Sequence, residues 1–113
     1  MKKENRLKKR KQFNWTFKNG KAVHTDNLTL VFTPSWAKDY KVGFSVTKKV
    51  GKAVVRNKIR RRLKAIVTKH QQEICQKHTL IFVAKPSIVD TPFQDIESQV
   101  LLLLKKSNLF REK

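Results

Sequence analysis

The central stretch of this chain reads KAVVRNKIRRRLK, from Lys52 to Lys64. Apolar residues recur through it and beyond it with the spacing of one face of an α-helix. These residues are Val55, Ile59, Leu63, Ile66, Val67 and Ile74. The pattern predicts a helix over residues 54–76 that packs this stripe into a core, so that its many charges are fixed on a folded surface.

The predicted helix carries a high density of positive charge. Between Lys41 and Lys64 there are ten Lys or Arg residues and no Asp or Glu. The polar side chains next to the apolar stripe are Arg56, Arg60, Lys64, Asn57 and Arg61. A charged helix face is usually only solvated, but like charges one turn apart repel each other and weaken the helix. We therefore expect this array to bind nucleic-acid phosphates, and charge alone does not choose between RNA and DNA.

Shorter patterns flank this helix and predict three strands and two further helices. We expect a helix over residues 10–19, strands over 28–33, 42–47 and 79–84, and a final helix over 92–106. The resulting order is α-β-β-α-β-α. It predicts an α+β fold, a single-domain α/β sandwich in which helices cover one face of a small mixed sheet.

The ends of the two outer helices carry signals of their own. Gly20 occupies the position of a C-cap glycine after the first helix. Thr91 is expected to be the N-cap of the last helix, with Pro92 at its first helical position. The first helix is expected to flank the open face of the sheet, which carries Thr29, Val31, Thr33 and Ser45.

The composition fits one small, strongly basic domain. The chain has 113 residues, with 27 Lys or Arg against 8 Asp or Glu, and a formal net charge of +19. Such self-repulsion opposes compaction unless a polyanion relieves it, so nucleic acid is the expected partner. We expect residues 1–113 to form a single domain in which residues 1–11 are a basic, flexible arm.

The sequence indicates neither secretion nor a membrane span. The segment Met1–Arg6 is basic, but no apolar stretch follows it as in a signal peptide. The longest strongly apolar run, Val100–Leu104, is much too short to cross a bilayer. Cys75 has no second cysteine with which to form a disulfide, which fits a reducing compartment. A soluble, cytoplasmic protein without a membrane partner is expected.

Aromatic residues accompany the positive charges near the N-terminus. Phe13 and Phe17 lie one turn apart on one face of the first predicted helix. The cations around them are Lys8, Lys9, Arg10, Lys11 and Lys18. Two interpretations stay open, because the pair can pack into the core or stack on the bases of a single strand. Trp15 and Trp36 are weaker candidates for stacking, since Trp15 falls on a different helical face.

The residues that carry chemistry are sparse. Cys75 and His78 form an isolated C-x-x-H pair without the second pair that a zinc site needs. The eight acidic residues are scattered, whereas a two-metal nuclease centre needs clustered carboxylates. The sequence therefore predicts no catalytic residue, no metal ligand and no cofactor bound by the protein alone.

Several motifs occur together in a recognisable order. AVVRNKIRRRLK spans residues 53–64, and VGFSVTKKVG, residues 42–51, leads into it. RLK, residues 6–8, precedes the helix that carries Phe13 and Phe17, and FVAKP, residues 82–86, follows the basic helix. This pattern resembles the protein subunit of bacterial ribonuclease P over nearly the whole chain.

The resemblance implies a fold and a function. The implied fold is ribosomal-protein-like, with a left-handed β-α-β crossover where the right-handed form is the default. The implied function is that of a non-catalytic subunit of an RNA-based endoribonuclease. In this family the RNA subunit is the catalyst and holds most of the required Mg²⁺. The protein binds that catalytic RNA and the single-stranded 5′ leader of precursor tRNA, and no obligate protein partner is expected.

The resemblance also assigns roles by position. Contacts with the catalytic RNA fall to Arg56, Asn57, Lys58, Arg60, Arg61, Lys64, Lys48, Lys49 and Lys52. Contacts with the tRNA leader fall to Phe13, Phe17, Thr29, Val31, Ser45, Lys9 and Arg10. Lys58 stands where many members carry Arg, and Val31 where some carry an aromatic residue.

Two other hypotheses remain. A ribosomal or ribosome-assembly RNA-binding protein, with no role in tRNA cleavage, fits the size and charge equally well. A DNA-binding module is the third hypothesis, but the density of cations favours phosphate contact over base readout.

Overall fold

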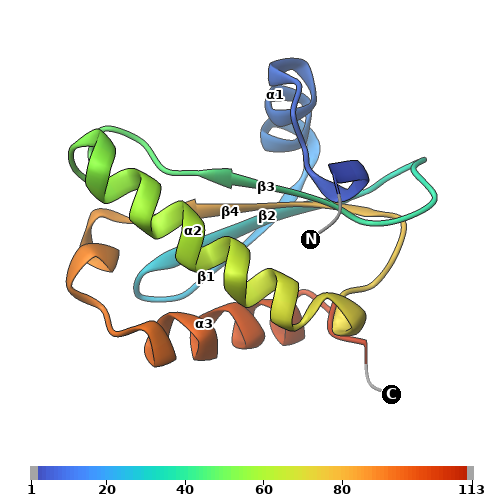
Figure 1. Ribbon diagram of the computed structural model, residues 1–113. Helices are drawn as coiled ribbons and strands as arrows, with labels where there is room; N and C mark the ends of the chain where they lie inside the picture. Colours follow the sequence, from blue (N-terminus) through green and yellow to red (C-terminus); the bar gives the residue numbers. More distant parts are fainter. Residues whose placement is uncertain (1–2, 112–113) are drawn as a thin grey trace.

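The computed structural model describes residues 3–111, which form a four-stranded sheet with helices on both faces (Figure 1). The α-helices in this part of the chain are α1 (Arg10–Asn19), α2 (Ala53–Lys69) and α3 (Phe93–Lys106). The strands are β1 (Lys21–His24), β2 (Leu28–Pro34), β3 (Lys41–Ser45) and β4 (His78–Ala84). Short 3₁₀ helices are η1 (Lys3–Asn5), η2 (Gln71–Glu73) and η3 (Pro86–Asp90). No helix among the described residues is long and apolar enough to cross a membrane.

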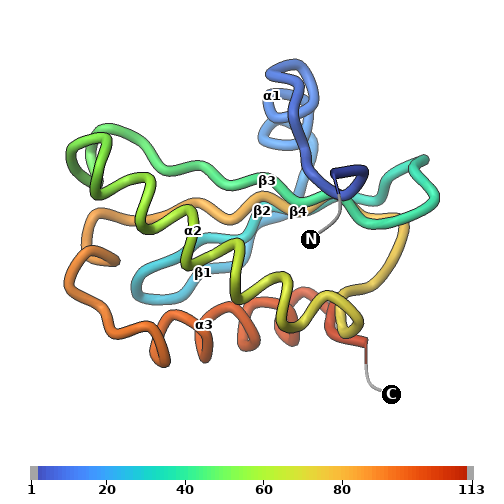
Figure 2. Tube along the Cα trace, in the orientation of Figure 1, coloured from blue at the N-terminus to red at the C-terminus, as the bar shows by residue number. Residues whose placement is uncertain are grey.

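The sheet is mixed, with strand order β1-β2-β4-β3. β2 pairs antiparallel with both β1 and β4, whereas β3 pairs parallel with β4. Helix α2 connects the two parallel strands, so β3, α2 and β4 form a β-α-β unit (Figure 2). This arrangement confirms the expected α+β sandwich with a small mixed sheet. The left hand of the crossover stays a prediction.

The strand β1 is absent from the expected order, which was wrong on this point. Its four residues, Lys21–His24, are mostly exposed and carry no clear alternation of apolar and polar side chains. It forms because the chain turns back at residues 25–27 and pairs Lys21 with Phe32 and His24 with Thr29. Tertiary pairing, and not local propensity, therefore creates this edge strand.

Three predicted boundaries also needed correction. Helix α2 ends at Lys69 and not at residue 76, because η2 turns the chain so that Ile74 forms an antiparallel bridge with Phe110. Strand β3 ends at Ser45 and not at residue 47. Helix α3 begins at Phe93 with Pro92 as N-cap, one residue later than expected.

The expectation that Thr91 caps α3 was also wrong, because Pro92 is the N-cap. The Thr91 hydroxyl donates to the carbonyl of Ser87 at 3.1 Å, so it closes η3 and leaves α3 uncapped by this side chain.

The two faces of the sheet differ in how they are covered. Helices α2 and α3 lie on one face, and α1 lies on the other (Figure 1). The main core lies under α2 and α3 and contains Leu28, Leu30, Leu80, Phe82, Ile59, Leu63, Ile66, Ile96, Val100, Leu103 and Leu104. The buried part of α2 is therefore the predicted apolar stripe, which confirms the period read from residues 55–67.

The face under α1 consists of three rows that cross β2, β4 and β3. The register places Thr29, Val83 and Ser45 in the first row, Val31, Ile81 and Gly43 in the second, and Thr33, Thr79 and Lys41 in the third. Val31 and Ile81 form a small buried cluster with Leu7, against which Phe13 packs. A Cβ atom at Gly43 would lie 2.5 Å from the Phe13 ring. Helix α1 therefore covers the middle row and separates the first row from the third.

The N-terminal segment packs along the free edge of β3. The Leu7 amide donates to the Val42 carbonyl at 2.9 Å, and the Asn5 side-chain amide donates to the Tyr40 carbonyl at 2.8 Å. Asn5 and Leu7 are 3% and 8% exposed. Through these two buried side chains the segment from residue 3 packs on the edge of the sheet, and the flexibility of the arm stays a prediction. The remaining part of the expected arm, residues 1 and 2, lies outside the described residues.

An ion-pair cluster connects the end of α2 to α3. The two ring nitrogens of His70 lie 2.9 Å from carboxylate oxygens of Glu73 and Glu97, and Lys69 Nζ lies 3.0 Å from Glu97. Hydrogen bonds from His70, then from Lys69, lower the pKa of Glu97 below its ordinary value of 4.5. A carboxyl with a lowered folded-state pKa contributes stability above its unfolded pKa, and loses it as the pH falls through the folded value.

We therefore expect Glu97→Gln to lower the melting temperature at about pH 6, and this deficit to shrink as the pH falls through the lowered folded-state pKa of the native carboxyl. Thermal unfolding followed by circular dichroism across this range measures the difference. Asp90→Asn, which removes an exposed carboxylate from η3, is the control. A deficit of Glu97→Gln that did not shrink with falling pH would show that charge is not the cause.

Candidate RNA-binding surfaces

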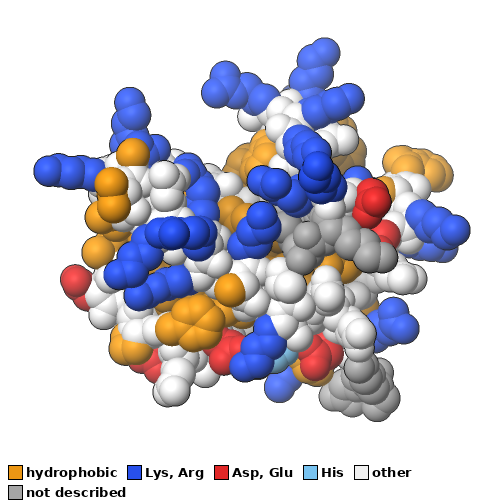
Figure 3. All heavy atoms as spheres, viewed as in Figure 1, with side chains coloured by type: hydrophobic (Ala, Val, Ile, Leu, Met, Phe, Trp, Pro, Cys, Tyr) orange, Lys and Arg blue, Asp and Glu red, His pale blue; other side chains and the backbone are white. Residues whose placement is uncertain are grey.

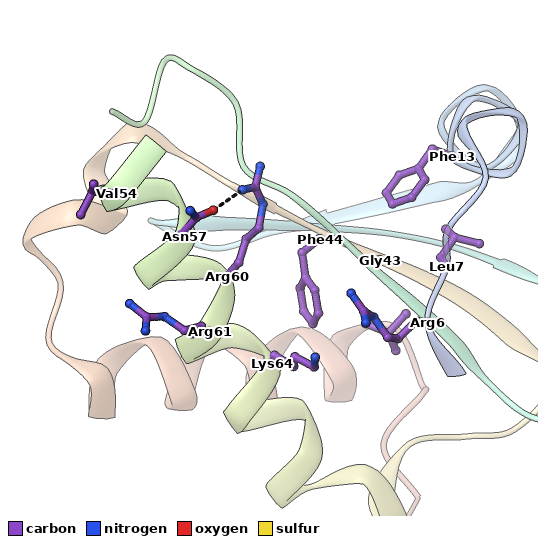
Figure 4. A pocket seen from close by; sticks show the side chains of 11 residues that line it. Arg6, Leu7, Phe13, Gly43, Phe44, Val54, Asn57, Arg60, Arg61 and Lys64 are labelled. Carbon is purple, nitrogen blue, oxygen red and sulfur yellow. Dashed lines mark hydrogen bonds between the residues drawn. The ribbon is translucent and has the colours of Figure 1, made fainter. Parts of the chain in front are cut away.

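A groove of about 660 Å³ lies between the N-terminal segment, β3 and α2. Its lining residues are Arg6, Leu7, Phe13, Val42, Gly43, Phe44, Val54, Asn57, Arg60, Arg61 and Lys64. Figure 4 shows Arg6 on one side and the polar residues of α2 on the other, with Phe44 between them. We call this the α2 groove. It combines four cations with an apolar floor, and no acidic residue lines it.

Arg60 is fixed within the α2 groove by two hydrogen bonds. Its Nη1 donates to Asn57 Oδ1 at 3.0 Å, and its Nη2 donates to the Val46 carbonyl at 3.1 Å (Figure 4 shows the first). The second bond joins α2 to the segment that follows β3. The Phe44 ring is held in place by the core, because it stacks on the Phe82 ring with the two centroids 6.2 Å apart. The groove is therefore a preformed surface, and its remaining cations Arg6, Arg61 and Lys64 are available to an anionic ligand.

The structure divides the residues that the resemblance assigned to the catalytic RNA. Asn57, Arg60, Arg61 and Lys64 line the α2 groove. Lys48, Lys49 and Lys52 are exposed in the connection between β3 and α2 or at the N-cap of α2, outside the lining of the groove. Figure 3 shows Lys and Arg side chains gathered over α2 and around α1.

Arg56 and Lys58 do not line the α2 groove either. Arg56 lies beside the buried stripe, and its Nε is the one buried side-chain nitrogen or oxygen within residues 3–111 that has no hydrogen-bond partner. Lys58 is exposed one residue before the buried Ile59. At 100° per residue, Arg56 lies at the end of the row of Arg56, Arg60 and Lys64 that is nearest the buried stripe, whereas Lys58 lies on the other side of the helix.

Arg6, Phe44 and Val54 also line the groove, although they were not among the predicted site residues. Arg6 belongs to the motif at residues 6–8, but only the bridge between Arg6 and Val42 brings it opposite α2. Phe44 lies on β3, and its side chain is only half-buried because β3 is the last strand of the sheet. No local pattern predicts either placement.

The second predicted surface lies on the opposite face of the sheet, beside α1. The first row there, Thr29, Val83 and Ser45, is half-buried. The Thr29 hydroxyl lies 2.9 Å from His24 Nδ1. Phe17 is 44% exposed and lies 40° from Phe13 on the helical wheel, about 200° from Trp15. We use the name α1 cleft for the leader surface that the resemblance predicts, with Phe17, Arg10 and the first row as its residues.

The structure gives the two rings of the aromatic pair different surroundings. Phe13 is partly buried against Leu7 and the middle row, whereas Phe17 is exposed, and stacking of a base on either ring stays a prediction. Val31 is 8% exposed under α1, so it supports the cleft from below and does not form an open floor. Lys9, the N-cap of α1, and Arg10 are both exposed near the cleft entrance.

The described residues contain no group of three His, Cys, Asp or Glu side chains placed to hold a metal ion. Cys75 Sγ lies 3.9 Å from the Asn108 carbonyl, and His78 Nδ1 lies 2.8 Å from the Gln76 carbonyl. The donor sets therefore do not fit a Mg²⁺ or Zn²⁺ site in residues 3–111.

Two cation-rich surfaces on a small mixed-sheet sandwich, one with an apolar floor and one with an exposed aromatic ring, are the features of a basic, nucleic-acid-binding α/β domain. The family model described as "Ribonuclease P" matches residues 1–108. The chain belongs to the ribonuclease P protein family.

Relatives of known name and structure agree. The chain is 37% identical to the "Ribonuclease P protein component" of Alkaliphilus oremlandii, over 96% of each chain, and 35% identical to that of Clostridium botulinum, over 96% of this chain and 98% of that one. The Staphylococcus aureus RNase P protein superposes with a TM-score of 0.87 at 27% identity, over 95% of this chain and 98% of that one. The Thermotoga maritima protein gives 0.82 at 25% identity, over 89% and 96%. These comparisons give no support to the ribosomal alternative.

Proposed function

We propose that this chain acts in tRNA 5′ maturation as a non-catalytic protein subunit of ribonuclease P, and that it binds RNA through two separate surfaces. Membership of the family supports the enzyme. The observation that carries the two-surface proposal is that the cations of the α2 groove lie on α2 and beside the edge of β3, whereas α1 and the first row lie on the other face of the sheet. Leu7, Gly43 and Phe13 extend the groove around that edge to the α1 face.

The α2 groove is proposed to bind the catalytic RNA subunit. Arg61 and Lys64 present cations at a spacing fixed by the helix, and Arg6 faces them from the N-terminal segment. Guanidinium groups bind phosphate oxygens through paired hydrogen bonds, which gives orientation as well as affinity. Asn57 and the bonded Arg60 hold the shape of the groove, so the ligand does not have to order them.

The exposed lysines between β3 and α2 extend this surface. Lys48, Lys49 and Lys52 lie in a row of sequence that contains no acid, and Lys58 continues it along the outer face of the helix. We propose that they contribute long-range attraction, whereas Arg56 mainly supports the helix from its buried side.

The α1 cleft is proposed to bind the single-stranded 5′ leader of precursor tRNA. A base stacked on Phe17 would place its phosphates near Lys9 and Arg10, while Thr29 and Ser45 offer hydroxyl groups from the sheet. Stacking accepts every base, so the cleft would hold leaders of different sequence.

The chemistry is proposed to belong to the RNA. The holoenzyme of this family requires Mg²⁺, and the carboxylates of residues 3–111 do not form a site for it. The cations of the α2 groove neutralise phosphates instead, which would lower the Mg²⁺ concentration that RNA folding requires.

Cleavage of a 5′-extended precursor tRNA at low Mg²⁺ tests this function. We compare the protein alone, a bacterial ribonuclease P RNA alone, and both together, with an unrelated basic protein of similar charge as control. Cleavage at the mature 5′ end only in the combination supports the proposal. If the chain binds RNA tightly but leaves cleavage unchanged, or if the unrelated protein stimulates equally, the proposed subunit role is wrong.

A further inference from the structure

A second groove, of about 460 Å³, lies between α1 and the loop that joins β2 to β3. The chain contains two Trp residues, and both of them line it. Trp15 is 55% exposed and Trp36 is 104% exposed. Gln12, Thr33, Ser35 and Lys41 add polar groups to the same groove. Neither the α2 groove nor the α1 cleft includes the two Trp side chains. We call this the tryptophan groove.

The tryptophan groove is separated from the α1 cleft by α1 itself. Trp15 and Phe17 are two residues apart, so their side chains point about 200° apart around the helix. The third row of the sheet, Thr33, Thr79 and Lys41, lies in the tryptophan groove, whereas the first row lies in the α1 cleft. Leu7 and the middle row fill the space between them. One strand of RNA stacked on Phe17 would therefore leave the tryptophan groove free.

The loop that carries Trp36 is fixed at both ends. The Ser35 amide donates to the Lys77 carbonyl at 2.7 Å, and the Ala37 amide donates to Ser35 Oγ at 3.1 Å. At the other end, the Tyr40 carbonyl accepts from buried Asn5. The backbone therefore holds a large aromatic side chain out in water at a defined place. A Trp is normally well buried, so this exposure indicates a ligand that covers the ring.

The charges around the tryptophan groove favour an anionic occupant. Lys11 precedes Trp15 by one helical turn, Lys38 follows Trp36 by two residues, and Lys41 lines the groove. Lys41 Nζ also donates to the Glu4 carbonyl, which holds it at the rim. The nearby Asp39 lines a different groove, with Tyr40 and Gln71. A second copy of this chain, with its own net charge of +19, would be repelled.

We propose that the tryptophan groove binds unpaired nucleotides of an RNA strand, with bases stacked on Trp15 and Trp36 and phosphates near Lys11, Lys38 and Lys41. It is a further single-stranded RNA site, distinct from the α1 cleft and from the α2 groove. The inference rests on RNA binding as part of the proposed function, but not on tRNA cleavage.

Intrinsic Trp fluorescence tests the inference directly, because every Trp of the chain lies in this groove. The probe is a single-stranded oligoadenylate of ten nucleotides, added to the full-length protein. Base stacking is expected to quench the fluorescence, and to do so equally in Phe17→Ala, whose ring lies in the α1 cleft. Inorganic polyphosphate, which has the charges but no bases, is the matched control and is expected to leave the fluorescence unchanged.

Affinity is measured separately, by fluorescence anisotropy of the labelled oligoadenylate in the Phe17→Ala background. Trp36→Ala is expected to weaken binding about five- to tenfold, and Trp36→Phe, which keeps a stacking ring, to restore most of it. Trp36 is fully exposed, so neither variant should change the melting temperature.

Three fluorescence results would overturn the inference: no quenching of the wild type by oligoadenylate, equal quenching by polyphosphate, or loss of quenching in Phe17→Ala. An affinity of the Trp36→Ala variant equal to that of the Phe17→Ala protein from which it is made would also overturn it. An apolar peptide that binds the groove while oligoadenylate does not would assign it to a protein partner and also overturn the inference. Quenching and the cleavage test are independent measurements, so failure of ribonuclease P stimulation leaves the fluorescence result interpretable.

Discussion

Arg61→Ala/Lys64→Ala is expected to lower the affinity for the catalytic RNA about 100-fold, because two charge-assisted contacts with phosphates are lost. Both side chains line the α2 groove and make no hydrogen bond that the fold needs. The dependence of log K on log salt should become shallower by about two, since each lost phosphate contact releases fewer counterions. Filter binding or calorimetry with the RNA subunit over a salt series measures both quantities.

The matched control removes the same charge from the far edge of the sheet. Lys21 lies on β1 and Lys105 on α3, both exposed and away from the α2 groove. Lys21→Ala/Lys105→Ala should weaken binding only slightly, through the change in overall charge. Equal losses in the two double variants would mean that total charge and not the α2 groove recruits the RNA.

Phe17→Ala is expected to weaken binding of leader-bearing precursor tRNA by about tenfold in the assembled holoenzyme, since stacking of one base contributes about 1–3 kcal/mol. Mature tRNA, which has no leader, should bind as before. Binding of the protein to the RNA subunit should also be unchanged, because Phe17 lies on the opposite face of the sheet from α2. Equilibrium binding of the two tRNAs to wild-type and variant holoenzymes separates these expectations.

Phe93→Ala is the matched control for this second prediction. Phe93 on α3 is 39% exposed, close to the 44% of Phe17, so both variants lose a ring of similar accessibility. Phe13 is unsuitable, because its packing on Leu7 and Gly43 makes a change in stability unavoidable. The proposed leader site would be wrong if Phe17→Ala and Phe93→Ala behaved alike, or if mature tRNA lost affinity with the precursor.

Helical periodicity in the sequence correctly predicted the packing face of α2 and the bounds of α1. Val55, Ile59, Leu63, Ile66 and Val67 are the residues by which α2 packs on the main core. Helix α1 runs from Arg10 to Asn19, within the predicted bounds. Both results follow because neighbours at i+3 and i+4 share a helix face whatever the rest of the chain does.

Gly20 shows how a local signal can be right for an additional reason. It is the C-cap of α1, but its φ of −83° is open to any residue. The structure requires glycine there because a Cβ would lie 2.6 Å from the Thr16 carbonyl and 2.7 Å from the Phe32 carbonyl. The second contact is with β2, and it cannot be predicted from the sequence around the end of α1.

The basic helix, the apolar stripe beneath it and the aromatic residues of α1 can be predicted from the sequence, because each depends on spacing within one element. The family resemblance can also be read there, because it is carried by short motifs in a fixed order. Tertiary structure alone decided which cations share a groove, since Arg6 joins Arg61 and Lys64 through pairing at the edge of β3, while Arg56 is turned toward the core. It also decided that α1 crosses the middle row of the sheet and makes two separate surfaces of one face. Strand register and the placement of a helix on a sheet depend on contacts between residues far apart in the chain, and local patterns do not encode them.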